Sequence, residues 1–180
     1  MRVDGRHERP DPAAFGLELP HVAPVVEHMV GHLQRNKAKL AASIFQMVQS
    51  VDSLALAERL NGFAEDSGTP LPVLMQVNIG GEESKSGFSP EEAFSAVSKM
   101  AAMGHLRIEG LMAIPPYSHN PEEVRPYFRR LRQMRDRMRE NHPGIRELSM
   151  GMSSDFEAAV EEGATMVRVG SAIFGQRPVK

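Results

Sequence analysis

Two short turns near the C-terminal end of the chain carry the residue types from which a phosphate site can be built. The first reads GMSS and the second VGSA, and each follows a short apolar run. Each turn should open a helix, where unpaired N–H groups and the helix dipole favour an anion. Gly151 and Gly170 would let the backbone approach that anion, while Ser153 and Ser171 would add hydroxyl donors. The pattern predicts one phosphate site shared by both turns, with plain turn and cap roles left open.

Arg168 adds weight to this prediction because it is a cation inside an otherwise apolar run. It lies shortly before Gly170, in the strand-like segment 165–169. A buried guanidinium must be paired or must face a ligand. The residue therefore indicates a ligand site at the end of this segment.

Strand-like and helix-like segments alternate along the chain, which is typical of an α/β fold with parallel strands. Apolar runs of strand type occupy 26–30, 44–51, 72–79, 106–114, 146–150 and 165–169. Helical patterns occupy 53–66, 90–103, 121–140 and 154–163. A doubly wound sheet and a barrel both satisfy the alternation. The two serine turns favour the barrel, because such barrels often bind phosphate with the loops after their last two strands.

Capping residues support the helix assignments. Ser89, followed by Pro90 and Glu92, predicts a capping box with a proline start. Ser154 and Glu157 predict a second capping box, at the helix that follows the first serine turn.

The helix predicted over 121–140 combines an apolar stripe with many cations. The stripe consists of Val124, Tyr127, Phe128, Leu131, Met134 and Met138. Seven arginines between positions 125 and 139 fall on the other faces. They favour a solvated helix surface, and nucleic-acid binding is the weaker alternative because acids are interspersed among them.

The composition is that of an ordinary globular domain. The chain has 180 residues, of which 41% are hydrophobic and 24% charged, and its net charge of −2 gives no general attraction to nucleic acid or membrane. It has no cysteine, which excludes disulfides and thiolate metal sites, and its seven histidines lack metal-binding spacing. Neither a membrane-spanning run nor a signal-peptide pattern is visible, so a cytoplasmic location is expected.

Five motifs occur in order: VGHLQRNKAK, SVDSLALAERLN, VLMQVNIGGEESKSGF, IEGLMAIPP and LSMGMSSDFEAAVEEGATMVRVGSAIFG. Together they resemble the pyridoxal phosphate homeostasis protein family, which is related in fold to the N-terminal barrel of alanine racemase. The resemblance covers about residues 26–176. It implies a (β/α)8 TIM-type barrel that binds pyridoxal 5′-phosphate, has no catalytic turnover and hands the cofactor to pyridoxal phosphate-dependent apoenzymes.

The resemblance also implies roles for individual residues. Ser153, Gly170 and Ser171 would contact the phosphate group, and Arg168 would approach the pyridine nitrogen. A cation there disfavours protonation of the ring, which suits a carrier better than an amino-acid enzyme. Met112 would lie against the ring, with a core role equally open. The predicted cofactor-binding residues are thus Met112, Gly151, Ser153, Arg168, Gly170 and Ser171.

The covalent anchor of the family has no counterpart in this sequence. Family members hold the cofactor by a Schiff-base lysine on the first strand, in a phrase close to AVSK, yet residues 1–24 contain no lysine. The letters AVSK do occur, ending at Lys99. There they belong to a helix whose buried stripe is predicted to contain Phe94, Val97 and Ala101, so Lys99 is expected to face solvent.

Six strand-like runs are fewer than the eight that close such a barrel. The first strand–helix unit and the second strand of the family are missing, so we expect a truncated and incomplete barrel. Its two open edges predict that the barrel is unstable alone, self-associates through these edges, or is covered by residues 1–24. That segment is rich in proline and charge and is expected to be irregular, with the barrel domain at 25–180.

Two enzyme functions are the alternatives. A pyridoxal phosphate-dependent racemase or decarboxylase would add a mostly β domain and a catalytic tyrosine, and no motif places Tyr117 or Tyr127 in that role. A barrel enzyme for a phosphorylated metabolite would need paired acids or a Lys–Glu couple at strand ends. Only Glu82, Glu83 and Lys85 form such a cluster, which a solvated loop also explains.

Overall fold

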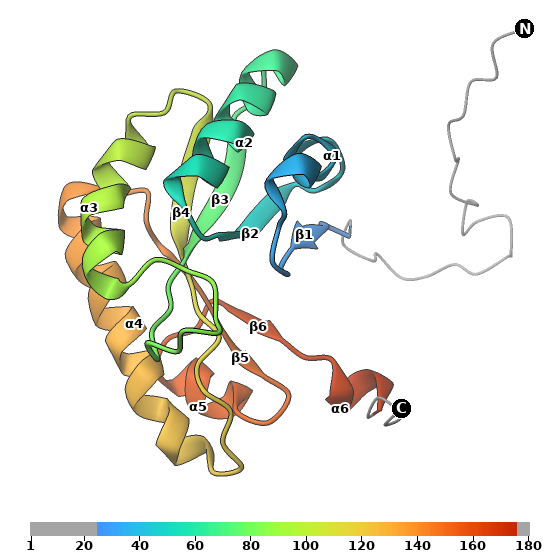
Figure 1. The fold of residues 1–180 in the computed structure, drawn as a ribbon. Coiled ribbons are helices and arrows are strands. Elements are labelled where there is room, and N and C mark those ends of the chain that lie inside the picture. Colours follow the sequence, from blue (N-terminus) through green and yellow to red (C-terminus); the bar gives the residue numbers. More distant parts are fainter. Residues whose placement is uncertain (1–24, 176–180) are drawn as a thin grey trace, which may run out of the picture.

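The protein folds as one parallel sheet with helices packed on one face (Figure 1). The computed structural model describes residues 25–175. Its six strands, in chain order and in sheet order, are β1 His28–Met29, β2 Met47–Val51, β3 Leu71–Gln76, β4 Leu106–Met112, β5 Glu147–Met152 and β6 Met166–Arg168. Every neighbouring pair is parallel, so each strand reaches the next by a crossover connection. The irregular segment predicted over 1–24 lies outside the described residues.

The helices lie in the crossovers, except the last one, which follows β6. These are α1 Ala38–Ile44, preceded by the 3₁₀ turn η2 Arg35–Lys37, then α2 Leu54–Ser67, α3 Pro90–Ala101, α4 Pro121–Asn141, α5 Phe156–Glu161 and α6 Ser171–Phe174. The four predicted helices and six predicted strands are confirmed. α1 was not predicted, and the strand expected from residue 44 begins only at Met47 because Ile44 still belongs to α1.

One of the two predicted capping boxes is confirmed. At α3, Ser89 Oγ accepts from the Glu92 N–H at 3.1 Å and Glu92 Oε2 accepts from the Ser89 N–H at 2.8 Å. The box predicted at Ser154 is wrong, because α5 begins at Phe156 with Asp155 as its N-cap. The Asp155 carboxylate instead accepts from the Met152 N–H at 2.6 Å, which tightens the turn between β5 and α5.

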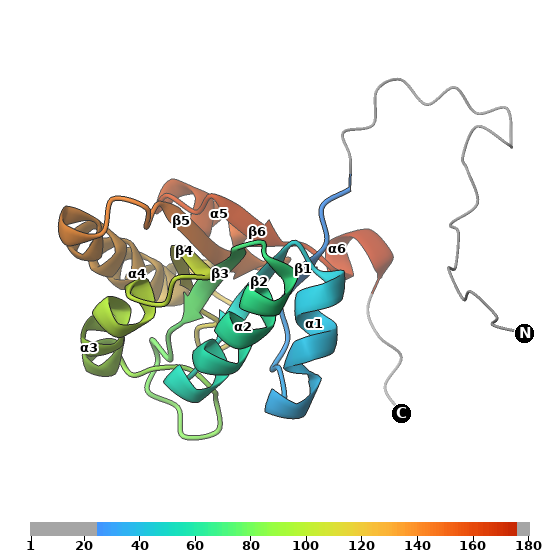
Figure 2. The same cartoon turned by 90° about the horizontal axis from the view of Figure 1, so that it is seen from above.

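The sheet is curled (Figure 2), and side chains from distant strands meet across its concave face. Gln49 on β2 accepts from Ser149 on β5 at 2.6 Å, although β3 and β4 separate these strands in the sheet. Gln49 also donates to the sulfur of Met166 on β6 at 3.4 Å. A flat sheet would keep these strands about 14 Å apart, at roughly 4.8 Å per strand. The described residues therefore form an incomplete barrel of six parallel strands, as the sequence predicted.

Alternation along the strands divides the buried side chains between the two faces. On β3, Val73 and Met75 join the main core under the helices, whereas Leu74 belongs to a smaller cluster. That second cluster also contains Met47 and Met112, with Met166 packed against it. Because successive side chains of a strand point to opposite faces, the small cluster lies on the concave face.

The predicted helix faces are largely correct. On α4 the stripe is buried as predicted, except that Tyr127 is only half-buried. On α3, Lys99 is exposed as predicted, but Ala101 is exposed too and the buried residues are Ala93, Ala96, Val97 and Met100. Among residues 25–175, no helix has both the length and the apolar character that crossing a membrane requires.

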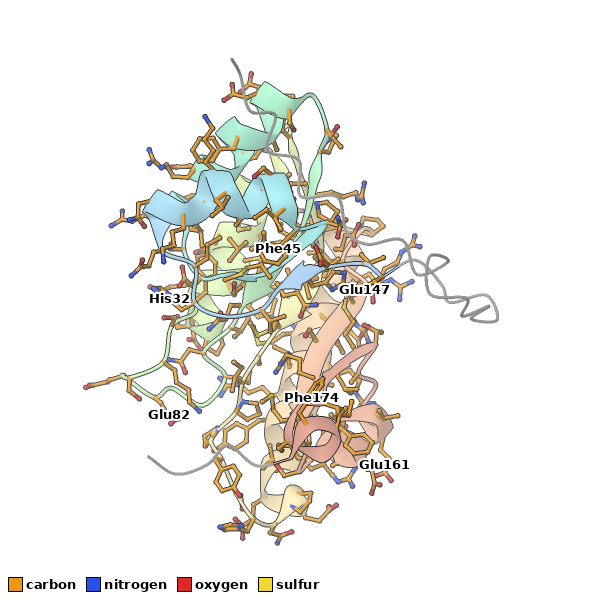
Figure 3. The ribbon with its side chains drawn as sticks, turned by 90° about the vertical axis from the view of Figure 1, so that its right-hand side faces the viewer. His32, Phe45, Glu82, Glu147, Glu161 and Phe174 are labelled. Carbon is orange, nitrogen blue, oxygen red and sulfur yellow. The ribbon has the colours of Figure 1, made fainter. Side chains whose placement is uncertain are left out.

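Apolar side chains are exposed around both ends of the strand order. Near β1 they are Val25, Val26, Leu40 and Ile44, and around β5, β6 and the helices beside them Met152, Val160, Val167, Ile173 and Phe174. Phe174, on α6, is 87% exposed (Figure 3). Self-association through these edges stays a prediction.

Candidate functional site

The two serine turns lie in contact at the carboxyl ends of β5 and β6. Ser153 Oγ accepts hydrogen bonds from the Gly170 N–H at 3.0 Å and from the Ala172 N–H at 3.3 Å. A hydroxyl of the first turn thus occupies the position toward which two amides of the second turn point. Ser171 is exposed as the first residue of α6. The structure therefore brings together the polar groups from which the phosphate site was predicted.

The two glycines of these turns have different surroundings. Gly151 is buried with a φ of +94°, and an added Cβ would lie 2.6 Å from Ala159 Cβ. It is thus required where β5 packs against α5, which is a different reason from the predicted approach of an anion. Gly170 is exposed and an added Cβ would meet nothing within 4 Å, so its backbone is accessible.

Arg168, the last residue of β6, is held by neutral groups. Its Nη1 donates to Ser149 Oγ at 2.6 Å and its Nη2 donates to the Ala113 carbonyl at 2.9 Å. Its Nε is buried and has no partner among the described residues. Burial lowers the pKa of Arg168 to about 10, opposed by the negative charge of Asp155. The guanidinium therefore remains charged at neutral pH, and its Nε–H is unused among the described residues.

A line of polar side chains continues from Arg168 across the concave face. Ser149 Oγ contacts Gln49 Oε1 at 2.6 Å, and Gln49 Nε2 contacts His28 Nδ1 at 2.8 Å. Sequence reasoning missed Ser149, Gln49 and His28 as members of the site. The available signal was a polar residue within an apolar strand, as at Gln49 and Ser149, but their meeting depends on how far the sheet curls.

Met112 is fully buried at the end of β4 and faces the same concave side. It pairs with Ser149 in the register of β4 and β5, and it packs in the cluster with Met47 and Leu74. The apolar wall beside the Arg168 site is thus built from methionine and leucine. Both roles considered for Met112, as core residue and as a contact for the ligand ring, agree with this position; the second stays a prediction.

The loop after β3 is fastened to the loop after β4. Lys85 Nζ lies 2.6 Å from Glu82 Oε1 and donates to the carbonyls of Pro115 at 2.9 Å and Ile114 at 3.4 Å. His32, in the loop after β1, contacts Asp52 Oδ2 through Nδ1 at 3.1 Å (Figure 3). These groups order the loops, and no cluster of His, Asp and Glu suited to a metal ion occurs in residues 25–175.

Three arginines of α4 converge on one carboxylate instead of simply facing solvent. Glu162, 5% exposed at the end of α5, lies 2.9 Å from Arg129, 3.2 Å from Arg132 and 3.8 Å from Arg125. The hydrogen bond from Arg129, with the charges of all three arginines, holds the pKa of Glu162 below its ordinary value. Arg125 also pairs with Glu161 at 2.7 Å. This cluster ties α5, and with it the first serine turn, to α4.

Comparisons with known proteins point to one family. The family model of the alanine racemase N-terminal domain matches residues 21–178. The pyridoxal phosphate homeostasis protein of Aquifex aeolicus is 44% identical over 151 residues, which are 83% of this chain and 66% of that protein. The homologue of the same name from Escherichia coli K12 is 43% identical over 153 residues, 83% of this chain and 64% of that protein. The chain thus spans about two thirds of the length of these relatives.

Solved structures agree with the sequence comparison. PipY of Synechococcus elongatus with PLP bound has a TM-score of 0.76 at 35% identity, covering 86% of this chain and 72% of that one. An alanine racemase of Clostridium difficile has a TM-score of 0.72 at 17% identity, covering 88% of this chain and 41% of that one. The second likeness concerns the fold alone.

Proposed function

We propose, since this chain belongs to the alanine racemase N-terminal domain family, that it binds pyridoxal 5′-phosphate at the carboxyl ends of β5 and β6 and serves pyridoxal phosphate homeostasis. The names of the relatives and the PLP-bound structure of PipY support the choice of ligand. The observation that carries the proposal for this chain is the pair of amides, from Gly170 and Ala172, that converge on Ser153 Oγ.

The residues at these strand ends fit the parts of the cofactor. Ser153 and Ser171 would donate their hydroxyl protons to the phosphate group, and Gly170, whose N–H already donates to Ser153 Oγ, would leave room for the phosphate beside its exposed backbone. Gly151 would contribute indirectly by letting the first turn pack against α5. Arg168 would face the pyridine nitrogen with its unpaired Nε, and Met112 would provide the apolar surface against the ring.

Arg168 also favours binding over catalysis. When bound, pyridoxal phosphate supplies a pyridine ring that withdraws electrons most strongly when its nitrogen is protonated. A guanidinium that remains charged at neutral pH opposes that protonation. We therefore propose a non-catalytic carrier, which would release the cofactor to apoenzymes, and a cytoplasmic location for that exchange.

Binding without a covalent bond is part of the proposal. Lys99 is exposed on α3, and Lys37 and Lys39 are exposed in η2 and α1. Lys85 is engaged by Glu82 and by two carbonyls. The same engagement removes the support for an enzyme of a phosphorylated metabolite that uses Glu82 and Lys85 as an acid–base pair.

Titration of pyridoxal phosphate into the purified chain, followed by calorimetry, tests the proposal. We expect saturable binding that inorganic phosphate weakens, and no adduct by mass spectrometry after borohydride reduction. Absence of binding would refute the ligand assignment. A reduced adduct at Lys85 or Lys37 would refute the non-covalent mode and leave the ligand assignment intact.

A further inference from the structure

We propose that Ser149 and Gln49 are positioning residues, which hold Arg168 through a one-way chain of hydrogen bonds ending at an unprotonated Nδ1 of His28. The chain links β6, β5, β2 and β1 across the concave face. Its effect on cofactor binding rests on the proposed function. Its geometry concerns only residues of this protein and can be tested without the cofactor.

The direction of the chain follows from the chemistry of its first member. An arginine guanidinium can only donate, so Ser149 Oγ must accept from Nη1 at 2.6 Å. The hydroxyl proton of Ser149 is then free to be donated to Gln49 Oε1, also at 2.6 Å. With its oxygen turned toward Ser149, Gln49 presents its NH₂ group to His28 Nδ1 at 2.8 Å. That nitrogen must accept, so the ring proton of a neutral His28 is on Nε2.

Burial makes the chain costly to break. Ser149 is 0% exposed and Gln49 4% exposed, so water cannot easily replace a lost partner. Among residues 25–175 the Arg168 guanidinium has one further hydrogen-bond partner, the Ala113 carbonyl, and its Nε has none. Loss of Ser149 would leave the guanidinium fixed at a single nitrogen. The orientation of Arg168 therefore depends on Ser149, one strand away in the sheet, and on Gln49, four strands away.

Gln49 offers two substitutions with opposite expected results. Gln49→Leu removes both the acceptor for Ser149 and the donor to His28, so the chain fails from end to end. Gln49→Glu keeps an acceptor for Ser149 but cannot donate as a carboxylate. His28 Nδ1 must then carry a proton and donate to the new carboxylate, which reverses the last bond and leaves Arg168 held.

Side-chain nitrogen NMR of the ligand-free protein reports on Arg168 and His28, the two ends of the chain of hydrogen bonds. In the wild type we expect the shift of an unprotonated acceptor at His28 Nδ1 and separate, slowly rotating Nη signals for Arg168. Gln49→Leu and Ser149→Ala should merge or broaden those Nη signals. Gln49→Glu should preserve them while moving His28 Nδ1 to the shift of an N–H. A merely structural role for Gln49 would not produce this difference between Gln49→Leu and Gln49→Glu.

Cofactor titration of the same proteins provides the second readout. Gln49→Leu and Ser149→Ala should weaken pyridoxal phosphate binding about tenfold, the effect of one lost hydrogen bond to a charged group, and Gln49→Glu by about threefold or less. Ser50→Ala is the matched control, because Ser50 is also 0% exposed on β2 but its hydroxyl has no partner among the described residues. This variant should leave both readouts unchanged.

Several outcomes would overturn the proposal. One is a protonated Nδ1 in a neutral His28 of the wild type, and another is unchanged Arg168 signals in Gln49→Leu. A third is an equal loss of pyridoxal phosphate affinity in Gln49→Leu, Ser149→Ala and Gln49→Glu. Circular dichroism shows which variants fold. If Gln49→Leu does not fold, the signals of the near-isosteric Gln49→Glu decide whether the hydrogen bonds hold Arg168. If the wild type binds no pyridoxal phosphate, the proposed function fails. The NMR result still decides whether the chain of hydrogen bonds from Arg168 to His28 exists.

Discussion

The two serine turns, at the ends of β5 and β6, both have a glycine shortly before a serine, but the surroundings of these residues differ. Gly151 is buried against Ala159 with a positive φ, whereas Gly170 is exposed with open space where a side chain would extend. Ser153 accepts from two amides of the other turn, while Ser171 is exposed at the start of α6. The first turn is therefore a packed frame, and the second is the accessible part that the frame holds in place.

This difference shows that one site can depend on two kinds of contact. The packed turn is fixed by the close approach of β5 to α5 and by the arginines that bind Glu162. The accessible turn supplies amides and is oriented by Ser153. Substitution of the buried Gly151 should therefore act mainly on folding, whereas substitution of Gly170, or of Ser153, which orients the second turn, should act mainly on binding.

The largest effect should come from Gly151→Ala. Its Cβ would clash with Ala159 at 2.6 Å, and a φ of +94° is strained for any residue with a side chain. Overpacking and backbone strain together should lower the free energy of unfolding by about 2–4 kcal/mol. Urea denaturation followed by circular dichroism measures this loss.

Gly170→Ala is the matched control for Gly151→Ala. Its φ is −116° and the space is open, so stability should change by no more than about 0.5 kcal/mol. Binding of pyridoxal phosphate should nevertheless weaken, because the new methyl group lies where a phosphate would approach. Equal losses of stability in the two variants would show that the turns do not differ as described.

A smaller effect is expected from Ser153→Ala. Loss of the hydroxyl removes the bonds that orient the second turn, at a cost of about 1 kcal/mol in pyridoxal phosphate affinity, or about fivefold. Ser171→Ala is the comparison, with a change below about threefold because its hydroxyl orients no other part of the site. Calorimetry of both variants measures the difference in affinity, and a larger loss in Ser171→Ala would show that the hydrogen bonds of Ser153 do not determine binding.

Local patterns in the sequence were enough for most of the fold. Apolar periodicity located the six strands, and the rule that parallel strands end at one edge brought Ser153 and Gly170 together. α1 was missed because it is short and buries only Ala38 and Ala41, which leaves little periodic signal. The cap of α5 was misassigned because Ser154 and Asp155 are adjacent cap-forming residues that sequence alone does not rank.

The unpredicted parts of the site all depend on distant side chains. Ser149 and Gln49 meet only because the sheet curls, and they are 100 positions apart in the chain. Glu162 was not distinguished from its neighbour Glu161, yet only Glu162 is buried under the arginines of α4. Contacts of this kind follow from the three-dimensional path of the chain, which periodicity and spacing do not determine.

The smallest effect is expected at Glu162, whose ion pairs with the arginines of α4 hold the packed turn in place. This effect should depend on pH. The pKa of Glu162 is lowered in the folded protein by its hydrogen bond with Arg129 and by the charges around it. A carboxyl with a depressed folded pKa contributes stability that is fully present above its unfolded pKa and is lost as pH falls through the folded pKa. Glu162→Gln should therefore lower the urea midpoint at pH 7, by less than Gly151→Ala does.

The difference between Glu162→Gln and the wild type should be constant from pH 6 to 7 and should shrink as the pH falls below about 4.5, the ordinary pKa of a glutamate. It should also shrink in high salt, because the arginine side chains are partly exposed and their charges are screened. Glu161→Gln is the control: Glu161 is exposed and its pair with Arg125 lies at the surface, so its substitution should leave the midpoint nearly unchanged. A Glu162→Gln deficit that persists undiminished at pH 3 would mean that α5 is held by packing alone, and that the frame of the first turn does not rest on this carboxylate.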